Sequence, residues 1–217
     1  MSSTIIDAIG QQGMLPLYFH PDPVVSKNVL TALYNAGIRV VEYTNRGQAA
    51  LENFKGLLQL RDASMPGMLL GIGTIKNEKD AADYHRAGAD FLISPCFSAE
   101  ILAYVQKHQL TWVPGCMTPS EINQAEQNGI RFVKLFPGNL LKPGFMAAIK
   151  PLFPQMRFMP TGGVELEESN LKDWFAAGVS AVGMGSKLIT KTLLEENDFN
   201  TLEEMTRKAL ELIQSIK

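Results

Sequence analysis

The chain has 217 residues, a mass of 23.9 kDa and a net charge of −2. This is the size of one domain, and a composition of 46% hydrophobic and 19% charged residues excludes a mainly disordered chain. The slightly acidic balance argues against a nucleic-acid-binding protein, which usually carries a basic surface, so we expect no nucleic-acid partner.

The number of cysteines and the amino-terminal residues indicate the cellular compartment of the protein. Two cysteines are too few for a disulfide scaffold and fit a reducing compartment, so we expect a cytoplasmic location. Residues 1–10 lack the basic segment and the apolar run of a signal peptide. No apolar run approaches the ~18 residues that a membrane helix needs, so we expect no membrane partner either.

Short runs rich in β-branched and apolar residues alternate along the chain with segments of helical length. This alternation is typical of βα units on a parallel sheet. The eight predicted strands are, in chain order, Met14–Phe19, Arg39–Thr44, Met68–Gly73, Phe91–Ser94, Thr111–Pro114, Phe132–Phe136, Arg157–Pro160 and Ala181–Met184.

Start and stop signals mark the predicted helices. An extra helix is expected over residues 3–12, before the first strand, and a closing amphipathic helix over residues 201–216. Asn77 before an acidic first turn and Gly88 after the last turn bound one helix between them. Another helix start is predicted at Thr118, which is followed by Pro119 and Glu121. The Thr side chain can cap the helix, and the Glu side chain can accept a hydrogen bond from the backbone N–H of the Thr.

Eight parallel strands can form an open doubly wound sheet or a closed barrel. The open sheet usually carries a glycine-rich turn after its first strand, whereas Phe19-His20-Pro21-Asp22-Pro23 follows the first strand here. Units of about 27 residues suit a compact barrel. We therefore expect residues 1–217 to form a single domain of the α/β class, a (β/α)8 TIM barrel with an extra N-terminal helix.

The second predicted strand carries a carboxylate in an apolar run. Val40, Glu42 and Thr44 share one face because side chains alternate along a strand. A carboxylate in such surroundings costs free energy unless it is paired or has a chemical task. Pairing with Arg46 at the barrel rim is the structural alternative to a catalytic role.

The sixth predicted strand carries a lysine between apolar neighbours. Phe132, Lys134 and Phe136 share a face. Removing lysine from water disfavours the ammonium, and the neutral amine is the form that attacks a carbonyl, so Lys134 is a candidate for an imine. The alternative to this catalytic role is a structural one, in which Lys134 reaches solvent or only forms an ion pair with Glu42.

Glycine turns follow the last two predicted strands. Gly162-Gly163 follows the seventh strand, and Gly185-Ser186 follows the eighth. Barrels of this kind often bind phosphate at these two turns, where backbone N–H groups can approach an anion. Thr74, after the third strand, is expected either to cap a turn or to direct its hydroxyl at a substrate.

Histidine and cysteine have no metal-binding pattern. His20, His85 and His108 lack partners at ligand spacing and are expected in loops or at the surface. Cys96 and Cys116 are expected to be small apolar fillers. The sequence therefore predicts neither a metal nor a cofactor.

Several of these segments together resemble the KDPG/KHG aldolases, which act on 2-dehydro-3-deoxy-phosphogluconate and 4-hydroxy-2-oxoglutarate. The similar segments keep the family's order and spacing and are Val41-Glu42-Tyr43-Thr44-Asn45-Arg46, Gly71-Ile72-Gly73-Thr74, Ile93-Ser94-Pro95, Val113-Pro114-Gly115, Lys134-Leu135-Phe136-Pro137 and Pro160-Thr161-Gly162-Gly163. The chain departs from the family at Cys96 and Met184, where members usually carry glycine.

The resemblance implies a metal-free class I aldolase, usually a homotrimer, that cleaves a phosphorylated keto acid to pyruvate and glyceraldehyde 3-phosphate. It leaves 4-hydroxy-2-oxoglutarate open as a second substrate, with glyoxylate as the other product. By the same resemblance, Lys134 forms the Schiff base and Glu42 is the general acid and base. The substrate-binding residues that it implies are Arg46, Thr74, Pro95, Phe136, Thr161, Gly162, Gly163, Gly185 and Ser186.

Two other functions stay open from the residues alone. One is another phosphate-binding barrel enzyme, such as a sugar-phosphate epimerase, although the metal-binding histidines of that class are missing. The other is a barrel that binds a keto acid without catalysis, which would work without Lys134 and Glu42.

Overall fold

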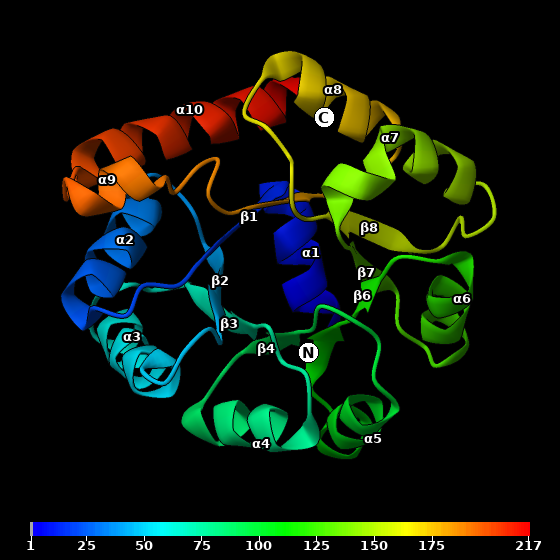
Figure 1. The fold of residues 1–217 in the computed structure, drawn as a ribbon, viewed down its shortest axis with the longest axis horizontal. Coiled ribbons are helices and arrows are strands. Elements are labelled where there is room, and N and C mark those ends of the chain that lie inside the picture. Colours follow the sequence, from blue (N-terminus) through cyan, green and yellow to red (C-terminus); the bar gives the residue numbers. More distant parts are fainter. Residues whose placement is uncertain (1) are drawn as a thin grey trace.

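The computed structural model describes residues 2–217, with side chains from Ile5 onward, as strands that curl around one axis with helices outside them (Figure 1). The strands are β1 (Met14–Tyr18), β2 (Val40–Thr44), β3 (Leu69–Gly73), β4 (Phe91–Ile93), β5 (Thr111–Val113), β6 (Gly115–Cys116), β7 (Phe132–Leu135), β8 (Arg157–Pro160) and β9 (Val182–Met184). The helices are α1 (Ser2–Gln12), α2 (Pro23–Asn35), α3 (Ala50–Ser64), α4 (Glu78–Ala87), α5 (Ala99–His108), α6 (Pro119–Gln127), α7 (Gly138–Ile149), α8 (Glu168–Ala176), α9 (Lys191–Glu195) and α10 (Phe199–Ile216).

The expected closed barrel of eight strands is wrong. Within residues 2–217 the strands form an open, curled six-stranded parallel sheet, in the order β5-β4-β3-β2-β1-β9, and a separate three-stranded sheet, β6-β7-β8. Pro114 separates β5 from β6, and a proline has no N–H to donate to a ladder. Between β8 and β9 the described residues form one isolated bridge, Thr161 to Gly183, instead of a continuous ladder.

The local predictions agree closely with the elements. Each of the eight predicted strands lies within one residue of an observed strand at both ends, and only the short β6 was not predicted. The Asn77 side chain accepts a hydrogen bond from the Asp80 N–H, and Gly88 ends α4 with a φ of 105°. Thr118 and Glu121 form the expected capping box of α6.

Two apolar layers lie on the two sides of the strands. The larger layer fills the space between the strands and the outer helices, and Val41 and Tyr43 belong to it. The smaller layer lies inside the curl and contains Leu15, Val40, Phe91, Ile93, Val113, Phe132, Met159 and Ala181. Ile9 of α1 packs against this inner layer, so α1 covers the end of the curl where the strands begin.

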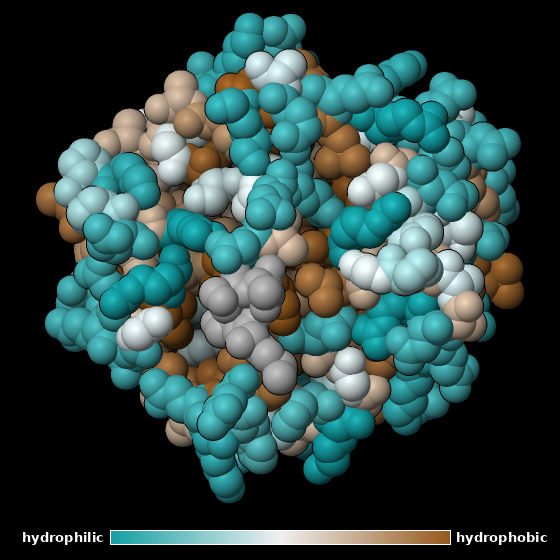
Figure 2. All heavy atoms as spheres, turned by 180° about the vertical axis from the view of Figure 1, so that it is seen from behind, coloured by the Kyte–Doolittle hydropathy of each residue, from teal (hydrophilic) through white to brown (hydrophobic). Residues whose placement is uncertain are grey.

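The face opposite to that of Figure 1 is largely polar at its rim, with hydrophobic residues gathered around its centre (Figure 2). No helix within residues 2–217 is both long and apolar enough to cross a membrane.

Candidate active site

A cavity of about 410 Å³ opens where the strands end. Its lining contains ten of the eleven predicted site residues, namely Arg46, Thr74, Pro95, Lys134, Phe136, Thr161, Gly162, Gly163, Gly185 and Ser186. The eleventh, Glu42, is fully buried behind this lining. Two larger hollows lie at the opposite end, beside Asp7 of α1, and contain none of the predicted residues.

Lys134 forms part of the floor of the cavity, and the buried Glu42 lies directly behind it. The Lys134 Nζ lies 3.5 Å from the Glu42 Oε1, and the exposed fractions of the two side chains are 7% and 1%. Neither carboxylate oxygen of Glu42 accepts a hydrogen bond from the described residues. Since a buried charge without hydrogen bonds is costly, this arrangement is typical of a reactive site rather than of a stabilising ion pair.

Two features of the fold place this pair: the alternation of side chains along each strand, and a glycine on the strand beside Glu42. Lys134 and Glu42 point to the inside of the curl, directly above the inner apolar layer. Gly73 on the neighbouring strand leaves the room that the Glu42 carboxylate occupies, because a Cβ at this position would overlap the carboxylate. Among the described residues Glu42 pairs with Lys134, so the expected alternative of a Glu42–Arg46 pair is wrong.

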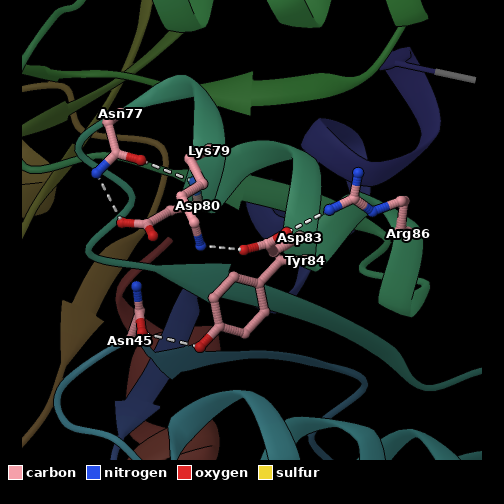
Figure 3. A network of polar contacts seen from close by, with 7 residues as sticks. All are labelled: Asn45, Asn77, Lys79, Asp80, Asp83, Tyr84 and Arg86. Atoms are coloured by element: carbon pink, nitrogen blue, oxygen red, sulfur yellow. Dashed lines mark hydrogen bonds and ion pairs between the residues drawn. The ribbon is translucent and has the colours of Figure 1, made fainter.

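The segment that carries Arg46 is held by α4 (Figure 3). The Tyr84 hydroxyl donates to the Asn45 Oδ1 at 2.9 Å, and the Asn45 N–H donates to the Gly73 carbonyl at 2.8 Å. Among the described side chains Arg46 forms no ion pair, so its exposed guanidinium is available to an anion. Sequence reasoning missed Tyr84, because an aromatic residue on the inner face of a helix is usually a core residue.

Thr74 and Thr161 both show local features that functional sites often carry. Thr74 has a φ of 65°, which is rare and strained for a β-branched residue. The Thr161 hydroxyl is buried and has no hydrogen-bond partner among the described residues. A Cβ at Gly183 would overlap this hydroxyl, so Gly183 makes room for Thr161 much as Gly73 does for Glu42.

The two glycine turns lie side by side at the ends of β8 and β9. Gly162 and Gly163 have φ values of 90° and 71°, which glycine adopts without strain. Gly185 and Ser186 line the same part of the cavity. The neighbouring Met184 is buried in the outer apolar layer, so its side chain does not narrow this turn.

Within residues 2–217 no cysteine or histidine belongs to the lining of the cavity. Cys116 is a buried filler, as expected, and burial raises the pKa of its thiol to about 12. Cys96 is exposed, so the expectation of a small apolar filler is wrong for this residue. His20 lies in the loop after β1 and His108 is exposed at the end of α5, as expected, whereas His85 is half-buried on α4, where burial lowers its pKa. The described residues contain no group of three or more His, Cys, Asp or Glu side chains arranged to hold a metal ion.

Comparisons with known proteins agree on one family. Residues 13–205 match the family model described as KDPG and KHG aldolase. The chain is 30% identical to the 2-dehydro-3-deoxy-phosphogluconate aldolase of Treponema pallidum, over 97% of this chain and 98% of the relative. It is 32% identical to the KHG/KDPG aldolase of Escherichia coli, over 83% and 82% of the two chains.

The fold is also similar to a solved aldolase structure. The KDPG aldolase of Legionella pneumophila, with pyruvate captured as a covalent carbinolamine, superimposes with a TM-score of 0.85 at 25% identity, covering 96% of this chain and 98% of that chain.

Proposed function

Because this chain belongs to the KDPG and KHG aldolase family, it is a carbon–carbon lyase of the aldolase type, and we propose that it cleaves 2-dehydro-3-deoxy-6-phosphogluconate through an imine on Lys134. The products are pyruvate and glyceraldehyde 3-phosphate. The observation that carries this proposal is the buried pair of Lys134, at the floor of the cavity, with Glu42 directly behind it. A sugar-phosphate epimerase or a non-catalytic barrel is not favoured, since the matching relatives are aldolases.

The reaction begins when the Lys134 amine attacks the C2 ketone and forms a carbinolamine. Glu42 transfers protons, directly or through a water, while this intermediate loses water and becomes a protonated imine. Glu42 then removes the proton of the C4 hydroxyl, the C3–C4 bond breaks, and its electron pair moves into the imine. The aldehyde leaves, and an enamine of pyruvate remains on Lys134. Protonation at C3 and hydrolysis release pyruvate and the free amine.

The other cavity residues bind the two ends of the substrate in this proposal. Arg46 and Thr74, at the ends of β2 and β3, hold the carboxylate of the keto acid. The glycine turns after β8 and β9, together with Ser186, hold the phosphate through backbone N–H groups and one hydroxyl. Pro95, Phe136 and Thr161 line the space between the two ends, and the Phe136 ring centroid lies 5.5 Å from the Lys134 Nζ.

The phosphate assignment is tested with two substrates. We expect kcat/KM for the phosphorylated six-carbon keto acid to exceed that for 4-hydroxy-2-oxoglutarate by a large factor, because a remote dianion supplies binding energy to the transition state. Ser186→Ala should reduce this preference about 2- to 10-fold, the effect of one hydrogen bond. A coupled assay of pyruvate release measures both. Equal efficiency on the two substrates would mean that the glycine turns are structural.

Gly73 offers a test of how Glu42 is positioned. Gly73→Ala places a methyl group where the Glu42 carboxylate lies, so we expect kcat to fall about 10²-fold, as small displacements of catalytic groups do. Gly144→Ala is the matched control, because a Cβ there has open space around it. Thermal unfolding of both variants separates misplacement from loss of fold. Normal turnover by a folded Gly73→Ala variant would contradict the proposed role of Glu42.

We also propose that the protein is a homotrimer in the cytoplasm. The family resemblance supports the trimer, and two free thiols support a reducing compartment. Light scattering after size exclusion should give about three times the 23.9 kDa of one chain. A mass of one chain at assay concentrations would exclude the trimer.

A further inference from the structure

Lys187 places a third cation in the cavity wall, beside the two glycine turns. It directly follows Ser186 and lines the same cavity as Gly162, Gly163 and Gly185. The other two cations of the lining are Lys134, to which the imine is assigned, and Arg46, which follows β2. In the sheet order, β1 separates β2, which Arg46 follows, from β9, which Lys187 follows.

A glutamate on the neighbouring turn holds this cation. The Lys187 Nζ lies 2.9 Å from the Glu165 Oε1, and the exposed fractions of the two side chains are 52% and 38%. The Asn170 side chain accepts a hydrogen bond from the Glu165 N–H at 3.0 Å and so fixes the segment that follows Gly162-Gly163. An ion pair as exposed as this one contributes little to stability, so Lys187 can exchange partners at small cost.

We propose that Lys187 is a specificity-determining residue that leaves Glu165 and pairs with the phosphate of the substrate. This inference rests on the proposed function. The backbone N–H groups of the glycine turns orient a phosphate but carry no net charge, whereas a lysine neutralises part of its double negative charge. With an unphosphorylated keto acid no competing dianion is present, and Lys187 stays with Glu165. Because Lys187 changes partner only for a phosphorylated substrate, it favours the binding of that substrate over an unphosphorylated one.

The central experiment compares Lys187→Met with the wild type on both substrates. We expect KM for the phosphorylated keto acid to rise about tenfold or more with little change in kcat, since a charge-assisted contact to a remote group is lost. The preference for that substrate over 4-hydroxy-2-oxoglutarate should fall by the same factor. Lys191→Met is the matched control, because Lys191 also pairs with a glutamate, Glu195, but does not line the cavity.

A second variant removes the charge of Glu165, the partner that Lys187 is proposed to leave. Glu165→Gln frees Lys187 and removes a negative charge near the phosphate, so KM for the phosphorylated substrate should fall a few-fold. Raising the salt concentration should raise this KM more steeply for the wild type than for Lys187→Met, because screening weakens a charged contact. Both variants should melt near the wild type, as their side chains are partly exposed.

The outcomes separate the inference from the function on which it rests. If the wild type prefers the phosphorylated substrate and Lys187→Met keeps that preference, the role of Lys187 is wrong and the proposed function stands. If Lys187→Met and Lys191→Met lose the preference equally, the effect is one of overall charge, and the role of Lys187 is again wrong. If the wild type has no preference, the phosphate assignment fails and the inference fails with it.

Discussion

Borohydride reduction in the presence of pyruvate is expected to add one reduced pyruvate group to the protein, on Lys134. Lys134 lines the cavity, so a carbonyl compound can reach its amine, and Glu42 lies 3.5 Å away, where the proposed mechanism needs a group that transfers protons. Mass spectrometry of the intact protein and of its peptides measures the number and the position of adducts. The same treatment without pyruvate should leave the mass unchanged.

Lys134→Met should take up no adduct and should lose at least about 10⁴-fold in kcat, since the covalent intermediate is then impossible. Lys150→Met is the matched control, because Lys150 is also partly buried and near an aromatic ring, Phe158, but does not line the cavity. An adduct on Lys150 instead of Lys134, or full turnover by Lys134→Met, would refute the imine on Lys134.

Replacement of Glu42 by Gln should lower kcat about 10²- to 10⁴-fold, the usual contribution of general acid–base catalysis. Gln has nearly the same shape, so it fits the space beside Gly73 and the fold should persist. An amide cannot take the proton of the C4 hydroxyl, which makes bond cleavage the step that suffers most. Steady-state kinetics with the phosphorylated keto acid, together with circular dichroism, measure both effects.

The same variant should still form an imine with pyruvate, but more slowly, because Lys134 is present and only the proton shuttle is lost. Trapping with borohydride after increasing times of incubation would show this delay. A Glu42→Gln enzyme with near-normal cleavage would place the proton transfer on another group, and Thr161, whose buried hydroxyl has no described partner, would be the next residue to test.

Much of the local structure could be predicted from the sequence. The strands were located to within one residue because β-branched runs and turn residues mark their ends. The capping residues Asn77 and Thr118 were identified because capping depends on neighbours within one helical turn. Family membership, predicted from motifs spread along the chain, is confirmed by the family match.

Connections between distant strands could not be predicted in the same way. The sequence shows that a strand ends at Pro114. It does not show that Gly115 and Cys116 continue as β6 and pair with β7. The single bridge between Thr161 and Gly183 likewise depends on how two strands approach each other in space. The predicted closed barrel was wrong for this reason, although the elements themselves were in their expected places.

The sequence by itself determined which side chains share one face of a strand, because alternation along a strand is a local property, and it thereby made Lys134 and Glu42 candidates for a catalytic pair. Only the tertiary structure decided that their charged atoms lie 3.5 Å apart, that Gly73 leaves room for the carboxylate, and that Lys187 reaches the cavity while paired with Glu165. These contacts join residues far apart in the chain, and the register and curl of the whole sheet set their distances.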